Sequence, residues 1–225
     1  MELHAVLFDM DGTLVDTEGL WRQTVEEEAR KLGLGLDDEG IAFVLGRSVK
    51  DSAEYLASFT GGRADVNRLC DTLEHRFAQL VEHQIVPLPG ALRLLDTLHA
   101  AGVPTALVSA SPRSIVDTVL DTLGRHRFVT SFAAGETPET KPAPDPYQAA
   151  MAALGVGPAH CVAVEDTPTG VASAEAAGCA VVAVPSLADI VPAPRRTVAR
   201  SLLDVDLDLL RSMLLLSEKG FTPST

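Results

Sequence analysis

The first strongly apolar segment of the chain, Ala5-Val6-Leu7-Phe8, runs directly into Asp9-Met10-Asp11-Gly12-Thr13. A short hydrophobic run that ends at acidic residues and a glycine predicts a buried parallel strand followed by a loop. In open α/β sheets, ligands bind at the carboxyl ends of such strands. Two carboxylates placed there repel each other unless a cation or an electrophile lies between them. The segment therefore suits a nucleophilic Asp, a proton-transferring Asp and a divalent metal acting on a phosphoryl group; the alternative is an Asp-Gly turn that only ends a strand.

Length and charge exclude several classes of protein. The 225 residues are 46% hydrophobic and 22% charged, an ordinary globular composition, and they suffice for one large domain or one domain with an insertion. A net charge of −13 argues against partners such as nucleic acid or an anionic membrane surface. An anionic substrate therefore needs a local cation, from a metal or from particular Lys and Arg residues. We expect a monomer or a weak homo-oligomer.

The cysteines and the N-terminus indicate the compartment. The three cysteines are scattered without metal-ligand spacing, and Cys161 and Cys179 each open an apolar run, which predicts small core residues. The start of the chain lacks the basic region of a signal peptide, and no stretch approaches the length of a membrane span. The expected compartment is the cytoplasm.

The segment from residue 17 to about residue 86 is predicted to be entirely helical. Apolar residues recur there at helical spacing, and glycines end the periodic stretches. Ser48 with Asp51 three residues later predicts a capped helix start. The Pro87-Leu88-Pro89-Gly90 sequence predicts a stiff turn that can act as a hinge. Helices are expected over 17–31, 36–45, 48–57 and 64–83.

From residue 90 onward the pattern alternates between helices and strands, which implies a parallel sheet with helices on both faces. The helix that starts at Ser111-Pro112 is expected to have its proline at the first helical position. Residues 217–225 are expected to form a frayed tail. Helices are predicted over 91–101, 111–124, 146–154, 171–177 and 202–215, and strands over 104–109, 132–134, 161–164 and 179–184.

The predicted fold is therefore α/β, with a Rossmann-like parallel sheet core and an inserted all-helical domain. The core is expected to comprise residues 1–16 and 88–225, and the inserted helical domain residues 17–87. The insertion follows the acidic loop directly.

Three further polar features follow predicted strands. Ser109 follows one strand, Lys141 lies in a proline-rich loop after the next, and Glu165-Asp166 follows a third. Singly, these are explained as a helix N-cap, a solvated loop lysine and an acidic pair at a helix N-terminus. Together they fall at the ends of strands of one predicted parallel sheet. A shared carboxyl edge would bring them close to Asp9 and Asp11.

These residues match four motifs in order: Asp9-x-Asp11-Gly12-Thr13, Ser109, Lys141-Pro142 and Glu165-Asp166. The chain thereby resembles the haloacid dehalogenase superfamily, in the subgroup with a small helical cap inserted after the first motif, over essentially its whole length. The resemblance implies that Asp9 attacks the substrate phosphorus to form an aspartyl phosphate, which water then hydrolyses. It also implies that Asp11 protonates the leaving oxygen and later deprotonates that water.

The resemblance further implies a Mg²⁺ site between Asp9, the backbone carbonyl of Asp11 and Asp166, with Glu165 bound directly or through water. Ser109 and Lys141 would hold the remaining phosphoryl oxygens. A cis Lys141–Pro142 bond is expected.

Substrate contacts are expected from both predicted domains. Thr13 and Ala110 lie in or beside the core motifs, whereas Trp21, Arg47 and Lys50 lie in the predicted cap. The alternative for Trp21, the only tryptophan, is a buried cap-core aromatic residue.

The reaction class depends on a few positions. Asp11 argues against dehalogenases and phosphonatases, which lack it. The β-phosphoglucomutase branch shares Ser109-Ala110-Ser111 and Glu165-Asp166. Where that branch has a cap histidine and a cap arginine, however, this chain has Trp21 and Val49. The stretch from Asp16 to Trp21 resembles the sugar phosphate phosphatases. The chain is expected to be a Mg²⁺-dependent phosphatase that acts on a small phosphorylated metabolite, with a hexose or polyol phosphate as the first candidate substrate. The alternatives are a mutase and a non-catalytic phospho-ligand binding module.

Overall fold

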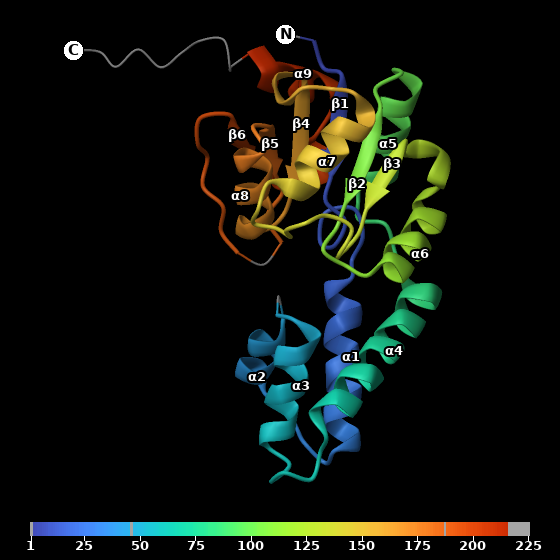
Figure 1. The fold of residues 1–225 in the computed structure, drawn as a ribbon, viewed down its shortest axis with the longest axis vertical. Coiled ribbons are helices and arrows are strands. Elements are labelled where there is room, and N and C mark those ends of the chain that lie inside the picture. Colours follow the sequence, from blue (N-terminus) through green and yellow to red (C-terminus); the bar gives the residue numbers. More distant parts are fainter. Residues whose placement is uncertain (1, 46, 187, 216–225) are drawn as a thin grey trace, which may run out of the picture. The chain divides into compact units, whose positions relative to one another are not determined.

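The structure is a computed structural model that describes residues 2–45, 47–186 and 188–215. It divides the chain into two compact units, one made of Met1–Val15 with Pro87–Thr225 and the other of Asp16–Val86 (Figure 1). The second unit is thus inserted into the sequence of the first. That the two units act as a catalytic core and a cap remains a prediction.

The first unit is built on a six-stranded sheet in the order β3-β2-β1-β4-β5-β6, with every pairing parallel. Val6 in the inner strand β1 pairs with Thr105 on one side and Val162 on the other. This topology confirms the predicted α/β fold class. The strands are β1 (Ala5–Phe8), β2 (Thr105–Val108), β3 (Thr130–Phe132), β4 (Cys161–Glu165), β5 (Ala180–Ala183) and β6 (Arg196–Val198).

Helices cover both faces of this sheet, which explains why β1 is apolar at every position. Alternate side chains such as Leu7 and Ala163 pack with Tyr147 and Val171 from α7 (Asp145–Leu154) and α8 (Pro168–Ala176). On the opposite face of the sheet, α5 contacts β2, and α9 contacts β4 and β5 (Figure 1). The remaining helices of the unit are α5 (Ala91–Ala100), α6 (Arg113–Leu123) and α9 (Leu207–Leu215).

The boundaries of several elements differ from those predicted. Pro112 takes the N-cap position of α6, with extended ψ of 151°, instead of the first helical position. The strand predicted at 132–134 is β3 at Thr130–Phe132. β6 was not predicted, because a three-residue strand with one apolar side chain gives no alternation to detect.

The last predicted helix, 202–215, begins later than expected. Residues Leu202–Asp204 form a 3₁₀ turn, and α9 starts at Leu207. The side chain of Asp206 accepts a hydrogen bond from the backbone N–H of Leu209 at 2.8 Å, as a helix-capping residue does. The frayed tail predicted for 217–225 lies outside the described residues.

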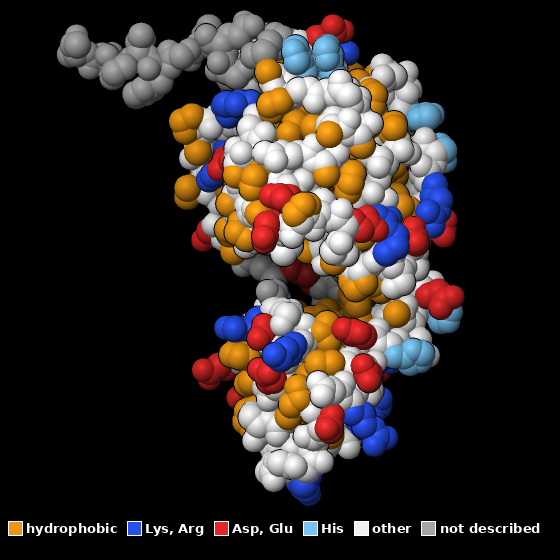
Figure 2. All heavy atoms as spheres, viewed as in Figure 1, with side chains coloured by type: hydrophobic (Ala, Val, Ile, Leu, Met, Phe, Trp, Pro, Cys, Tyr) orange, Lys and Arg blue, Asp and Glu red, His pale blue; other side chains and the backbone are white. Residues whose placement is uncertain are grey.

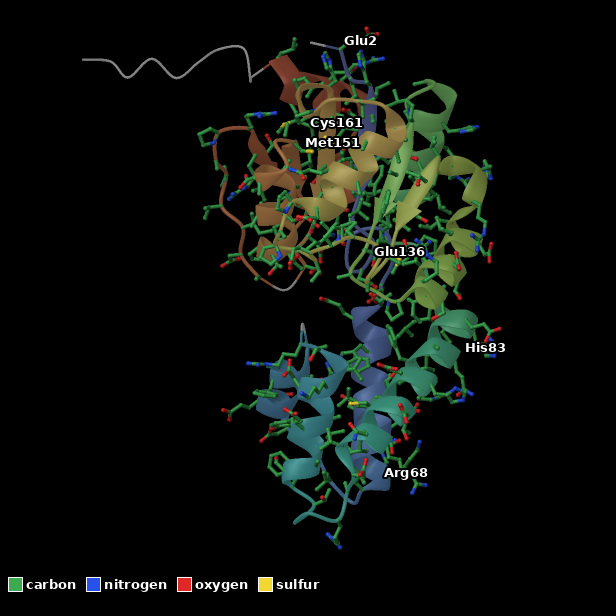
Figure 3. The ribbon with its side chains drawn as sticks, viewed as in Figure 1. Glu2, Arg68, His83, Glu136, Met151 and Cys161 are labelled. Atoms are coloured by element: carbon green, nitrogen blue, oxygen red, sulfur yellow. The ribbon has the colours of Figure 1, made fainter. Side chains whose placement is uncertain are left out.

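The two later cysteines are core residues, as predicted. Cys161 on β4 and Met151 on α7 belong to one buried cluster (Figure 3). Cys179 lies in the same cluster, with its Sγ 3.8 Å from the Met151 sulfur. Burial raises the pKa of both thiols to about 12, so these cysteines stay protonated at neutral pH.

The Asp16–Val86 unit is helical throughout its described secondary structure. Ser48 and Asp51 form the predicted capping box at the start of α3. The Arg76 guanidinium on α4 pairs with Glu27 on α1 at 2.7 Å, and hydrogen bonds from Arg76 lower the pKa of Glu27 to about 2. The helices are α1 (Glu18–Lys31), α2 (Asp38–Val44), α3 (Val49–Ser58) and α4 (Val66–Gln84).

Charged side chains of both signs are interspersed over the face of this unit drawn in Figure 2. Among the described residues, none of the helices combines the length and the apolar character needed to cross a membrane.

Trp21 lies in the hydrophobic core of the helical unit. Its side chain is only 9% exposed, and its indole N–H donates to the carbonyl of Val44 at 3.2 Å. The ring meets Phe77 edge to face, with 5.4 Å between centroids. This placement within one unit favours a packing role, and the predicted substrate contact of Trp21 stays a prediction.

Replacing Trp21 by Ala should destabilise the protein, because the truncation leaves a cavity between α1, α2 and α4. We expect a loss of about 3–5 kcal/mol in the free energy of unfolding, measured by circular dichroism in urea. Phe59→Ala is the control, because Phe59 is 55% exposed in the same unit, and its loss should be below about 1 kcal/mol. Equal losses in the two variants would contradict the packing role.

Candidate active site

A tight loop follows β1 and carries the first acidic residues. The carbonyl of Met10 accepts hydrogen bonds from the backbone N–H groups of Thr13, Leu14 and Val15, which curls the chain directly after Asp9. Gly12 has φ of +80°, and a Cβ there would lie 2.2 Å from a carboxylate oxygen of Asp166. Both the conformation and the close approach require glycine at this position.

Lys141 connects three segments at the carboxyl edge of the sheet. Its Nζ donates to Asp9 Oδ1 at 2.6 Å and to Glu165 Oε1 at 2.6 Å. A third hydrogen bond joins it to the carbonyl of Val108 at the end of β2, at 2.9 Å. The side chain is 7% exposed. The expected meeting of these segments is confirmed, and the Lys141–Pro142 bond is cis as expected.

The ion pairs set the charges of this cluster. Burial alone would lower the pKa of Lys141, but Asp9 and Glu165 raise it above its ordinary value, so the ammonium stays charged. Burial, and then repulsion from Glu165, raises the pKa of Asp9 well above its ordinary value despite Lys141. The second oxygen of Asp9, Oδ2, is buried and has no hydrogen-bond partner among the described residues. The cluster holds more negative charge than its ammonium compensates.

Glu165 is fully buried, and both of its carboxylate oxygens accept hydrogen bonds. Its Oε1 accepts from the Tyr147 hydroxyl at 2.6 Å as well as from Lys141, and its Oε2 accepts from the backbone N–H of Asp166 at 3.2 Å. A Cβ at Gly170 on α8 would lie 1.9 Å from Oε1, so the carboxylate needs glycine there. Sequence analysis missed Tyr147, whose signal, an aromatic residue on a helix, is also that of an ordinary core residue.

Asp166 is held by two hydroxyls. Thr13 donates to its Oδ1 at 3.2 Å, and Ser186, in the loop after β5, donates to its Oδ2 at 2.6 Å. Burial raises the pKa of Asp166 to about 6, although the hydrogen bond from Ser186 opposes the shift. Ser186 was also missed by sequence analysis; a polar residue just after a strand is the signal that would have indicated it.

Asp11 is held by the loop after β2. Its Oδ2 accepts hydrogen bonds from Ser109 Oγ at 3.0 Å and from Ser111 Oγ at 2.9 Å. Between the two serines, Ala110 is exposed. The predicted core residues therefore lie at the ends of the strands or in the loops that follow them, and Ser111 joins them unpredicted as a contact of Asp11.

Arg47 and Lys50, the predicted substrate contacts of the helical unit other than the buried Trp21, are exposed. The Arg47 guanidinium lies over the ring of Phe43, 4.1 Å from its centroid. The Lys50 ammonium lies 3.7 Å from a carboxylate oxygen of Glu54. Both side chains carry positive charge at the surface of their unit, and their contact with substrate stays a prediction.

The acidic cluster fits a divalent cation. Ligand oxygens of Asp9, Glu165 and Asp166 lie within 4.8 Å of one another. Asp9 Oδ2 lacks a partner among the described residues, and burial, with repulsion from Glu165 as a smaller cause, raises the pKa of both Asp9 and Asp166. Carboxylate and carbonyl oxygens are the donors that Mg²⁺ prefers.

A family model of haloacid dehalogenase-like hydrolases matches residues 3–178. Hexitol phosphatase A of Escherichia coli (strain K12) is 37% identical over 191 residues, which are 84% of this chain and 86% of that protein. Validoxylamine A 7'-phosphate phosphatase of Streptomyces hygroscopicus subsp. limoneus is 33% identical over 174 residues, or 76% of this chain and 81% of that protein. The crystal structure of CbbY from Rhodobacter sphaeroides in complex with phosphate has a TM-score of 0.76 at 27% identity, covering 92% of this chain and 99% of its own.

The chain belongs to the haloacid dehalogenase-like hydrolases, which confirms the resemblance found in the sequence. The enzyme class that these findings support is that of the phosphoric monoester hydrolases.

Mg²⁺ should stabilise the protein more at neutral than at acid pH. Without a cation, the pKa of Asp166 is about 6 in the fold against an ordinary 3.8, so stability falls as the pH rises through that window. Mg²⁺ competes with protons for the same oxygens and offsets this loss. We expect a larger rise in Tm with millimolar MgCl₂ at about pH 7.5 than at about pH 5. Asp166→Asn should remove most of the rise; an equal rise at both pH values would contradict the assignment.

Proposed function

We propose that this protein is a Mg²⁺-dependent phosphatase that hydrolyses a small phosphorylated metabolite, a hexose or polyol phosphate, through an aspartyl phosphate on Asp9. The observation that carries the proposal is the buried Asp9 carboxylate, which Lys141 holds through Oδ1 while Oδ2 has no partner among the described residues. Such a carboxylate is oriented and under-solvated, as a nucleophile must be.

In the first proposed step, Asp9 attacks phosphorus in line with the leaving oxygen. A bond forms between the Asp9 carboxylate and phosphorus as the bond from phosphorus to the leaving oxygen breaks, and Asp11 gives that oxygen its proton. Ser109 and Lys141 then donate to the phosphoryl oxygens, where charge accumulates, each by exchanging a hydrogen bond that it makes in the structure.

In the second step, Asp11 takes a proton from water, which attacks the phosphorus of the aspartyl phosphate. The bond between phosphorus and the Asp9 oxygen breaks as the bond to the water oxygen forms, so that inorganic phosphate leaves and the Asp9 carboxylate is restored. The same residue thus acts first as an acid and then as a base.

We propose that Mg²⁺ is held by Asp9, by the backbone carbonyl of Asp11 and by Asp166. Glu165 would bind the cation directly or through water. When bound, the cation neutralises the repulsion between the nucleophile and the anionic substrate. In the chain itself, Thr13 and Ser186 orient Asp166, and Gly12 leaves room for its carboxylate.

A sugar or polyol phosphate is the proposed substrate class, supported by the 37% identity to a hexitol phosphatase over most of both chains. Residues 17–87 are proposed to act as the cap. Arg47 and Lys50 are proposed to contact the substrate, because both are exposed cations in an otherwise strongly acidic protein.

Asp9→Asn should abolish phosphatase activity, because an amide cannot form the acyl phosphate. With p-nitrophenyl phosphate and Mg²⁺, we expect kcat/KM to fall on the order of 10³-fold or more, with far-UV circular dichroism unchanged. Asp208→Asn, at a side chain 93% exposed in the same unit, is the control and should keep wild-type activity. Activity of Asp9→Asn within tenfold of wild type would overturn the mechanism.

Among phosphorylated sugars, polyols and nucleotides, hexitol and hexose phosphates should give the highest kcat/KM. Free inorganic phosphate should appear in step with the dephosphorylated product. Arg47→Ala and Lys50→Ala should change this ranking with little change in Tm, because both side chains are exposed. A sugar phosphate isomer that accumulates without free phosphate would instead identify a mutase.

A further inference from the structure

The two hydroxyls that contact Asp11 come from one short loop. Ser109 and Ser111 both donate to Asp11 Oδ2, at 3.0 and 2.9 Å. The backbone N–H of Ser111 in turn donates to Ser109 Oγ at 2.9 Å. The two serines and the carboxylate therefore form a closed set of hydrogen bonds.

Ser109 cannot serve Asp11 and a substrate at the same time. A serine hydroxyl carries one proton, and the proposed mechanism needs that proton for a phosphoryl oxygen. Once Ser109 turns toward the substrate, its hydrogen bond to Asp11 is lost. Among the described contacts of the Asp11 carboxylate, the Ser111 hydroxyl is then the donor that remains.

The backbone of Ser111 is suited to this task. Its N–H is bound to Ser109, and its carbonyl accepts from the N–H of Ala134 at 2.9 Å. The next residue, Pro112, has φ of −56° and caps α6. The hydroxyl of Ser111 is therefore presented from a backbone that is fixed on both sides.

We propose that Ser111 is a positioning residue for Asp11: its hydroxyl keeps the Asp11 carboxyl aimed at the leaving oxygen after Ser109 has turned to the phosphoryl group. This inference rests on the proposed function, in which Asp11 is the general acid. Ser111 itself transfers no proton to the substrate.

The role predicts a specific dependence on the leaving group. A phenol with a low pKa departs as an anion with little protonation, whereas a poor leaving group needs the proton of Asp11. A loosely held acid therefore slows poor leaving groups selectively. A residue that only binds phosphate, or only supports the fold, affects good and poor leaving groups alike.

The experiment measures kcat/KM for a series of substituted phenyl phosphates and for sorbitol 6-phosphate, with saturating Mg²⁺. This ratio reports the steps up to loss of the leaving group. For Ser111→Ala, p-nitrophenyl phosphate should stay within about threefold of wild type, and the poorest leaving groups should fall about tenfold or more. The plot of log kcat/KM against leaving-group pKa should steepen.

Three further variants complete the test. Ser111→Thr keeps the hydroxyl and should restore the wild-type slope. Ser111→Cys replaces the hydroxyl by a somewhat larger thiol, which is a weaker donor, and should give an intermediate slope. This variant also provides a second test if Ser111→Ala has a lowered Tm. Asp11→Asn should show the steepest slope of the set.

The outcomes separate the two proposals. If Asp11→Asn runs parallel to wild type, Asp11 is not the general acid and the proposed function fails. If Asp11→Asn steepens the plot while Ser111→Ala and Ser111→Cys run parallel to wild type, the positioning role of Ser111 is overturned and the proposed function stands.

Discussion

One buried ammonium connects the segments from which the site is built. Asp9, Glu165 and the end of β2 all accept hydrogen bonds from Lys141, although they are far apart in the sequence. Buried carboxylates are costly unless they are paired and hydrogen-bonded, and removing one member of such a group leaves an uncompensated buried charge. The carboxyl edge of the sheet therefore depends on this lysine for its charge balance as well as for its geometry.

The charge balance at this edge is incomplete, because Glu165 and Asp9 differ in how many of their carboxylate oxygens accept hydrogen bonds. Glu165 accepts from Lys141, Tyr147 and a backbone N–H, whereas Asp9 keeps an oxygen with no partner among the described residues. The fully bonded carboxylate is held still, and the incompletely bonded one retains the capacity to react or to bind a cation. Perturbed groups of this kind gather where chemistry takes place.

Much of this arrangement could be predicted from local sequence. The bounds of β1 follow from an apolar run with an abrupt acidic end, and the capping box at Ser48 follows from a three-residue spacing. The meeting of Asp9 with Lys141 follows from parallel topology.

What could not be predicted depends on distant partners. Tyr147, Ser111 and Ser186 resemble ordinary core, capping or loop residues until the fold places carboxylates beside them. The late start of α9 was missed for a different reason: apolar periodicity continues through Leu202, while the helix begins where the Asp206 side chain accepts a hydrogen bond from the backbone N–H of Leu209.

The strand order also affects how the chain folds while it is being synthesised. β1 leaves the ribosome before its sheet neighbours β2 and β4, which begin only at Thr105 and Cys161. Until then the apolar Ala5–Phe8 segment has no sheet to join, and such late, non-local pairing slows folding. The Asp16–Val86 unit, by contrast, draws its hydrophobic core from its own helices. During translation, the inserted helices can therefore pack into their own core while the strand that precedes them still lacks its partners in the sheet.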